Sequence, residues 1–278
     1  MVHQQSSQKV VLVTGASSGM GKEFARALLE SGYIVYAAAR RIDQMQDLSK
    51  AGALTLKMDI TQEADVQAAV STIIKNHGGV DVLINNAGFG LYGAMEDIPL
   101  DAARYQFEVN LFGMARLTQL LLPSMRAKKS GKIINLSSMG GKVYFPMGSW
   151  YHATKHAVEG WSDCLRIELA PFNIDVVIIE PGVIATEFGD VVMQPLVQRS
   201  GKGAYAPMAN SFAKAMTESY KNNGASPPDV IVKLVLEAIT TTKPKTRYVA
   251  GKFAKPMMFI RKWLGDRTYD KAVLSMLK

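Results

Sequence analysis

"KVVLVTGASSGMG", residues 9–21, joins a short β-branched run to a glycine-rich turn. The run predicts a buried strand, because β-branched residues favour strands and the apolar stretch is too short for a helix. In the overlapping segment 20–32, Phe24, Ala27 and Leu28 recur at helical spacing, and a glycine closes the segment. The stretch therefore predicts a strand, a tight turn and a helix in succession.

The rest of the chain repeats this alternation. Apolar strands that alternate with helices predict a parallel sheet covered on both faces, and right-handed crossovers make the arrangement doubly wound. We expect a Rossmann-type α/β fold with about seven strands. Further strands are predicted at 33–39, 53–59, 80–88, 131–138, 174–182 and 246–251, and further helices at 63–78, about 102–127, 149–170 and 228–240.

Length and composition limit the possible classes. The chain has 278 residues, 48% of them hydrophobic, and no linker, repeat or low-complexity run, so residues 1–278 are expected to form one domain. A single cysteine, Cys164, permits no intrachain disulfide and, with four scattered histidines, no metal site. The polar start lacks the apolar core of a signal peptide, and no apolar run reaches the roughly 18 to 20 residues of a spanning helix. A soluble, cytoplasmic protein is expected.

The net charge of +8 is confined to the C-terminal part of the chain. Residues 243–278 contain ten Lys or Arg and two Asp, so the first 242 residues sum to zero. A neutral body argues against a nucleic-acid partner. We expect a basic helical extension at about 252–278 that packs on the domain or on a second subunit. Peripheral contact with an anionic membrane is the alternative, because Phe259 and Trp263 lie among the basic residues. The last helix would bury one apolar stripe: Tyr269, Val273, Met276 and Leu277.

The glycine-rich turn is a candidate phosphate site. Gly15, Gly19 and Gly21 follow the first strand with the spacing G-x3-G-x-G. Glycines let the backbone approach a pyrophosphate, and the helix N-terminus offers free N–H groups and a positive dipole end. An ordinary strand-to-helix turn is the alternative interpretation.

The end of the second strand indicates which dinucleotide is bound. NAD-binding folds usually carry an acidic residue here, but this chain has Ala39 followed by Arg40 and Arg41. Two arginines in this place can bind a 2′-phosphate, so NADP(H) is predicted as the cofactor. The alternative is a pair of solvated surface arginines.

These features occur together with motifs that resemble the short-chain dehydrogenase/reductase family in its ordinary single-domain form. The resemblance covers roughly residues 8–250. Within the family, the chain is similar in general character to the 17β-hydroxysteroid and retinol dehydrogenase branch. The motifs are TGASSGMG, Asp59 after the third strand, NNAG at 85–88, Asn110 in EVNLFG, Ser138 in NLSSMGG, YHATK at 151–155 and PGVIAT at 181–186.

The resemblance implies a catalytic role for four residues. Tyr151 would be the general acid/base, and Lys155, one helical turn away, would lower the phenol pKa together with the oxidised cofactor. Ser138 would donate a hydrogen bond to the substrate oxygen, with neighbouring Ser137 as the competing candidate. Asn110 would hold a water that links Lys155 to solvent, unless its side chain only bonds backbone.

The resemblance also implies the cofactor contacts and no metal. The cofactor-binding positions would be Gly15, Ser17, Ser18, Gly19, Met20, Gly21, Arg40, Arg41, Asp59, Ile60, Asn86, Ala87, Gly88, Tyr151, Lys155, Pro181, Gly182, Val183 and Thr186.

Side chains near these motifs indicate the substrate class. Apolar residues surround the catalytic motifs, and the segment at about 187–227, which covers the substrate in this family, adds more. We expect a bulky hydrophobic ketone, aldehyde or secondary alcohol, such as a steroid, a retinoid, or an aryl or long-chain ketone. The apolar set includes Phe89, Leu91, Tyr92, Met139, Val143, Tyr144, Phe145, Met147, Met193, Leu196, Val197, Tyr205, Met208, Phe212 and Met216.

Three reactive side chains near the motifs are expected to be inert. His152 and His156 are interpreted as ordinary helix residues, and Cys164 as a small buried apolar group. Two other functions stay open: a non-catalytic NADP(H)-binding redox sensor, and an epimerase or dehydratase of the extended branch. The family favours homodimers and homotetramers.

Overall fold

All seven strands of the computed structural model form one parallel sheet, with the order β3-β2-β1-β4-β5-β6-β7. The structure describes residues 8–220 and 224–277. The chain reverses its direction of winding between β1 and β4, as the doubly wound fold requires, so the predicted fold class is confirmed. The strands are β1 (Val10–Thr14), β2 (Ile34–Ala39), β3 (Leu54–Lys57), β4 (Val82–Asn85), β5 (Gly131–Leu136), β6 (Ile174–Pro181) and β7 (Arg247–Ala250).

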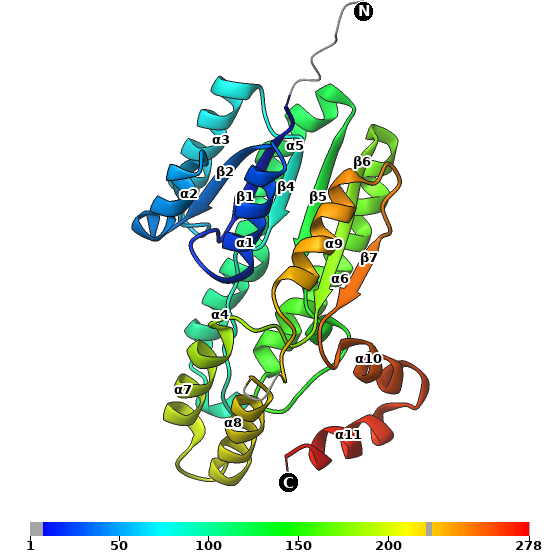
Figure 1. Cartoon of the computed structure of the whole chain (residues 1–278). Helices are drawn as coiled ribbons and strands as arrows, with labels where there is room; N and C mark the ends of the chain where they lie inside the picture. Colours follow the sequence, from blue (N-terminus) through cyan, green and yellow to red (C-terminus); the bar gives the residue numbers. More distant parts are fainter. Residues whose placement is uncertain (1–7, 221–223, 278) are drawn as a thin grey trace, which may run out of the picture.

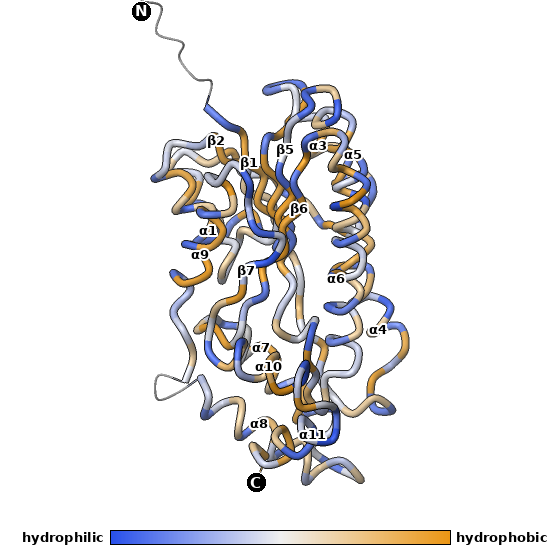
Figure 2. The backbone as a smooth tube through the Cα atoms, turned by 90° about the vertical axis from the view of Figure 1, so that its right-hand side faces the viewer, coloured by the Kyte–Doolittle hydropathy of each residue, from blue (hydrophilic) through white to orange (hydrophobic). Residues whose placement is uncertain are grey.

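Alternate side chains of β1 enter two separate cores. Val11 and Val13 belong to the core on one face of the sheet, whereas Val10 and Leu12 belong to the core on the other. This is the period-two pattern of a strand buried on both faces. Helices α1 (Gly19–Glu30), α2 (Gln46–Lys50) and α9 (Asp229–Thr240) cover the first face; α3 (Glu63–His77), α5 (Met114–Lys128) and α6 (Ser149–Leu169) cover the second (Figure 2).

The helix predicted at about 102–127 is longer and less regular than expected. It starts as α4 (Leu100–Phe107), widens into a π-helical segment (Glu108–Gly113) and continues as α5. A π-helical turn is closed by a hydrogen bond that spans one residue more than in an α-helix, and such turns are frequent at functional sites. Asn110 lies inside this π segment, which the apolar periodicity did not reveal.

Four helices lie beyond the carboxyl ends of the strands, at the bottom of Figure 1. The predicted substrate-covering segment contains α7 (Phe188–Ser200) and α8 (Ala206–Tyr220). The predicted C-terminal extension contains α10 (Ala254–Trp263) and α11 (Asp266–Ser275). Short 3-10 helices occupy Ile42–Met45, Met95–Asp97, Met139–Gly141 and Ala170–Phe172. Within the described ranges, no helix is both long and apolar enough to cross a membrane.

Candidate active site

A cavity of about 770 Å³ runs along the carboxyl edge of the sheet, where residues of the predicted glycine-rich, NNAG, NLSSMGG, YHATK and PGVIAT motifs meet. Ligands of doubly wound folds bind at this edge, at the point where the strand order reverses. The cavity joins the glycine-rich turn at one end to Ser138, Tyr151 and Lys155 at the other. Every predicted site residue lines it except Gly21 and Asn110.

The glycine-rich turn has the geometry of a phosphate site. Gly15 and Gly19 have positive φ angles of 67° and 53°, which side chains other than glycine rarely adopt. A Cβ on Gly21 would lie 2.3 Å from Asn86 Nδ2 and 2.4 Å from Gly15 O. Gly21 therefore allows α1 to pack against the turn and does not itself line the cavity. No side-chain hydrogen bond caps α1 at Ser18, so its first N–H groups are available to an anion.

The two arginines after β2 lie beside this turn. The Arg41 guanidinium donates hydrogen bonds to Ser18 Oγ at 3.1 Å and to Ser17 Oγ at 3.4 Å. Arg40 Nη1 donates to the Tyr105 hydroxyl at 3.0 Å. Both arginines are exposed and line the cavity, and among the described residues no carboxylate forms a salt bridge with either. Their positive charge is therefore available to an anionic ligand at this end.

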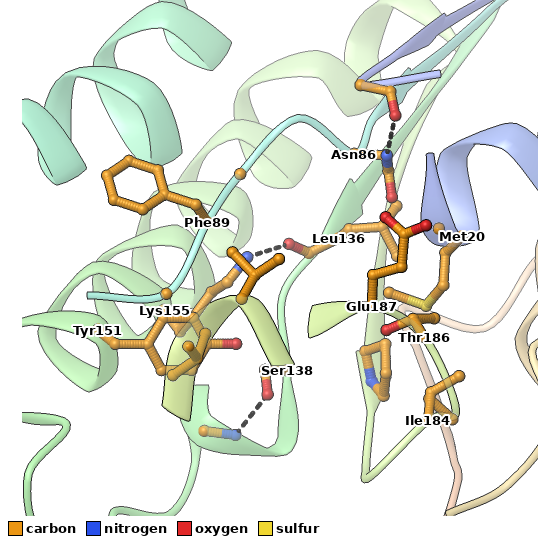
Figure 3. A pocket seen from close by; sticks show the side chains of 18 of the residues that line it. Met20, Asn86, Phe89, Leu136, Ser138, Tyr151, Lys155, Ile184, Thr186 and Glu187 are labelled. Atoms are coloured by element: carbon orange, nitrogen blue, oxygen red, sulfur yellow. Dashed lines mark hydrogen bonds between the residues drawn. The ribbon is translucent and has the colours of Figure 1, made fainter. Parts of the chain in front are cut away.

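Asp59 and Asn86 are held in place by backbone contacts. Asp59 Oδ1 accepts hydrogen bonds from the Thr61 amide at 3.0 Å and the Thr61 hydroxyl at 2.8 Å. Asn86 Nδ2 donates to the carbonyl of Thr14 at 2.9 Å, which fixes the end of β4 against the end of β1 (Figure 3). Both side chains reach the cavity as rigid parts of its wall.

Tyr151 and Lys155 lie one turn apart on α6, and both are buried. Lys155 Nζ donates to the carbonyl of Leu136, the last residue of β5, at 2.7 Å (Figure 3). Burial lowers the Lys155 pKa to about 8, and the nearby Glu159 carboxylate opposes this shift. Burial raises the Tyr151 pKa, and a hydrogen bond with Ser138 lowers it. The effect of burial is therefore larger than that of the Ser138 hydrogen bond, and the protein by itself raises the Tyr151 pKa instead of lowering it.

Ser138 lies where a hydrogen-bond donor to the substrate would be needed. Its side chain shares a hydrogen bond with Tyr151, and its Oγ accepts one from the Gly140 amide at 3.0 Å. Ser137 also lines the cavity, but its Oγ only approaches the carbonyl of Ser138, at 3.5 Å. The geometry therefore favours Ser138 over Ser137 as the partner of Tyr151.

The Asn110 side chain is used within the protein. Its Oδ1 accepts from the Phe89 amide at 3.0 Å, and its Nδ2 donates to the Phe89 carbonyl at 3.0 Å and to Thr154 Oγ1 at 3.1 Å. These bonds join the π segment to the loop after β4 and to α6. They match the alternative interpretation, in which the side chain bonds backbone. A water bound to Asn110 would have to use its main-chain carbonyl or the remaining lone pair of its Oδ1. The water that links Lys155 to solvent stays a prediction.

The histidines and the cysteine differ in their surroundings. His152 is buried; its Nδ1 lies 2.9 Å from the Gly140 carbonyl and its Nε2 accepts from the Phe145 amide at 3.0 Å. Burial lowers its pKa to about 4. His156 Nδ1 lies 2.9 Å from the carbonyl of His152.

The expectation for Cys164 is wrong: the thiol is exposed, because its position on α6 faces away from the sheet.

The substrate end of the cavity is apolar. The Tyr92 ring lies 5.4 Å from the Tyr151 ring and 5.9 Å from the Phe212 ring, centroid to centroid. Several of the predicted apolar residues line this end, and the others do not. Of those that do not, Leu91, Val143, Met147, Met193 and Leu196 are buried core residues, and Tyr144, Val197, Tyr205 and Met208 lie outside the lining. Those that line it are Phe89, Tyr92, Met139, Phe145, Phe212 and Met216.

Sequence reasoning missed the contribution of the C-terminal helices to this site. Met257 of α10 and Val273 of α11 line the cavity, as do Met276 and Leu277 just after α11. The apolar stripe at 269–277 had indicated only that the last helix packs on something, so the stripe was the available signal.

Comparisons with known proteins agree with this geometry. The family model described as short chain dehydrogenase matches residues 9–195. The chain is 34% identical over 268 residues to a 3-ketodihydrosphingosine reductase of Bacteroides thetaiotaomicron, covering 95% of this chain and 96% of that protein.

The chain belongs to the short-chain dehydrogenase family.

Solved structures of this family superpose on most of the chain. A short-chain dehydrogenase from Streptomyces avermitilis has a TM-score of 0.79 and 33% identity and covers 98% of this chain and 96% of its own. A serine dehydrogenase solved with NADP+ has a TM-score of 0.76 and 26% identity, over 87% of this chain and 94% of that one. A 3-ketoacyl-(acyl-carrier-protein) reductase from Brucella melitensis, solved with NADH, has a TM-score of 0.72 and 27% identity, over 87% and 95%. These two similar structures thus contain different nicotinamide dinucleotides.

Proposed function

We propose that this short-chain dehydrogenase is an NADP(H)-dependent oxidoreductase that interconverts a hydrophobic ketone or aldehyde and the corresponding alcohol. The observation that carries the proposal is one cavity that joins Arg40 and Arg41, which form no salt bridge among the described residues, to Ser138, Tyr151 and Lys155. A redox sensor would not need the buried Tyr151 and Lys155 pair. The glycine spacing also argues against the extended-branch epimerases and dehydratases.

The residues at the apolar end have distinct roles in this proposal. When bound, the reduced nicotinamide supplies the hydride. Ser138 donates a hydrogen bond to the carbonyl oxygen as negative charge develops there, and Tyr151 delivers the proton. Lys155, held by the Leu136 carbonyl, places a positive charge one helical turn from the phenol and favours its ionised form when the proton has left.

The choice of NADP(H) over NAD(H) is tested through Arg40 and Arg41. A 2′-phosphate paired with an arginine gains charge-assisted hydrogen bonds that NADH cannot form. In Arg40→Asp and Arg41→Asp we expect the Kd for NADPH to rise at least tenfold and the Kd for NADH to stay within about twofold, measured by cofactor fluorescence. Arg104→Asp, at an exposed arginine of α4 outside the cavity, is the matched control. Equal weakening of both cofactors would contradict the assignment.

The proposal also covers the domain, its location in the cell and its oligomeric state. Residues 1–278 act as one cytoplasmic NADP-binding domain in which residues 187–227 cover the substrate. Exposed Leu100, Tyr105 and Phe112 on the α4 side offer an apolar face for a second copy, which supports a homodimer or homotetramer. Light scattering of the protein and of Phe112→Glu tests this: loss of the oligomer in the variant is expected, and a monomeric parent protein would contradict it.

Peripheral contact with an anionic membrane is also proposed, through the outer face of α10. Lys255, Phe259, Lys262 and Trp263 are all exposed and recur at helical spacing, so they share that face. Trp263 is 65% exposed, and Lys262 Nζ lies 4.9 Å from its ring. Apolar rings flanked by basic residues match the chemistry of an anionic bilayer surface.

A further inference from the structure

Helix α11 is fastened to the loop that carries the catalytic residues. The loop 139–148 joins Ser138 to α6, and Tyr144 lies in it. The Tyr269 hydroxyl of α11 donates to the Tyr144 carbonyl at 2.9 Å, and the Tyr144 hydroxyl donates to Asp270 Oδ1 at 2.9 Å. The two tyrosine rings pack edge to face with centroids 4.9 Å apart. Two hydrogen bonds and an aromatic contact therefore set the position of α11 relative to Ser138 and Tyr151.

The inner face of α11 is a wall of the substrate end of the cavity. Tyr269 is fully buried and Val273 is 4% exposed, and both pack in a cluster with Met139, the residue after Ser138. Leu277, just after the helix, packs against the cluster that contains Tyr151. Because α11 and the residues directly after it contact both clusters, a change on this inner face alters the space next to the phenol.

The lining contributed by this part of the chain is apolar and adaptable. Among the described residues that α8, α10 and α11 give to the cavity, none is charged. The Ser219 hydroxyl donates to the Met216 carbonyl at 2.7 Å, so its proton is already used. Methionines at 216, 257 and 276 supply flexible side chains that adjust to a flexible ligand. The polar groups that α8 contributes to this lining are the hydroxyls of Ser219 and Tyr220.

We propose that the cavity beyond Tyr151 takes a single long unbranched apolar chain attached to the reacting carbonyl, and that the inner face of α11 is the wall that selects it. This inference rests on the proposed oxidoreductase function and narrows its substrate class. A rigid ring system with an oxygen at each end, such as a diketosteroid, is the competing substrate class.

The test is a chain-length series. NADPH-dependent kcat/KM is measured for unbranched methyl ketones of increasing length, with a diketosteroid alongside. Each methylene that enters an apolar site adds at most about fourfold to kcat/KM, the factor that corresponds to about 0.8 kcal/mol. We expect kcat/KM to rise by about two- to fourfold per methylene until the cavity is filled, and to exceed the value for the steroid.

Variants on the two sides of α11 locate the effect. Leu277→Asp places a charge on the inner wall and is expected to abolish the rise in kcat/KM from the shortest ketone to the longer ones. Leu274→Asp is the matched control, because Leu274 is 48% exposed and does not line the cavity, and it should keep the full gain. If Leu277→Asp loses all activity, Leu277→Trp replaces it and should lower the chain length at which kcat/KM stops rising.

The outcomes separate this inference from the function on which it rests. Turnover of ketones with no gain for longer chains, an equal gain in Leu277→Asp, or better turnover of the steroid would each overturn the inference and leave the oxidoreductase function standing. No NADPH-dependent turnover of any ketone would overturn the proposed function itself.

Discussion

At the residue scale, the proposed chemistry depends on how Tyr151 is brought to ionise. Burial alone raises its pKa, while the hydrogen bond from Ser138 lowers it. Lys155 has a pKa of about 8 and so stays protonated at neutral pH, one turn away on the same helix. The phenol pKa therefore falls into a useful range only when further positive charge enters the cavity. The oxidised nicotinamide ring of the proposed cofactor carries such a charge.

The assignment of Ser138 makes a prediction that distinguishes it from its neighbour. Ser138→Ala removes the donor next to Tyr151, and loss of one such donor typically costs about 10²- to 10³-fold in kcat. Ser137→Ala should change kcat by less than about tenfold, because its hydroxyl faces the Ser138 carbonyl at 3.5 Å, whereas the Ser138 side chain bonds to Tyr151. Steady-state kinetics of both variants decide the matter, and a dead Ser137→Ala with an active Ser138→Ala would reverse the assignment.

His152 predicts how stability depends on pH. Its folded-state pKa of about 4 lies below the usual 6.5, so the unfolded state binds more protons between these values. The stability due to the neutral imidazole is fully present above pH 6.5 and is lost as the pH falls toward 4. At about 1.36 kcal/mol per pH unit, the loss amounts to about 3 kcal/mol.

The measurement is urea unfolding at several pH values. In His152→Gln, whose amide can still bond Gly140 and Phe145, the free energy of unfolding should fall less between pH 7 and 4 than in the parent protein. His156→Gln, on the exposed side of the same helix, is the matched control and should follow the parent. Identical acid sensitivity in all three proteins would show that His152 does not titrate as described.

At the scale of elements, short motifs are predictable where local chemistry determines them. The β-branched run and the glycine turn correctly predicted β1, α1 and their junction, because strand burial and positive φ angles are local demands. The Tyr151 and Lys155 pair likewise follows from helical spacing, since residues four apart share a face.

Features that depend on contacts between distant segments were not predictable in this way. The π segment around Asn110 depends on bonds to Phe89 and to α6, which no local pattern encodes. The exposure of Cys164 depends on which face of α6 meets the sheet. The role of α11 was missed because its apolar stripe indicates burial without naming the surface that it covers. The residues that hold the cofactor stay a prediction, since the resemblance implied them.

The outer face of α10 leads to a prediction about membranes. The protein should sediment with phosphatidylcholine vesicles that contain phosphatidylglycerol, and less with phosphatidylcholine alone, because basic residues and apolar rings act together. Replacing Phe259 and Trp263 together by Ala should reduce sedimentation at least tenfold. Ile167→Ala is the matched control, since Ile167 is 67% exposed but lies on α6. Equal binding by all three proteins, or none by the parent, would contradict membrane contact through α10.

At the scale of the whole molecule, the fold divides the work between two ends of one cavity. The sheet brings the ends of β1, β2 and β4 to the proposed dinucleotide end, and β5 and α6 position the proposed catalytic residues. Helices α7, α8, α10 and α11 close the substrate end beyond the carboxyl edge of the sheet (Figure 1). The predicted motifs thus lie along the sheet edge and on α6, whereas the helices that cover the apolar end, α7, α8, α10 and α11, all follow β6 in the chain.

The central claim is that NADPH and Tyr151 together reduce a hydrophobic ketone in this cavity. The most direct measurement is the rate of NADPH oxidation in the presence of a long-chain methyl ketone, for the parent protein and for the Tyr151→Phe variant. The same rates are measured in parallel with NADH. We predict turnover with NADPH that exceeds turnover with NADH and falls at least about 10³-fold in Tyr151→Phe, while the Kd for NADPH changes little. Turnover that persists in Tyr151→Phe, or that prefers NADH, would contradict the account.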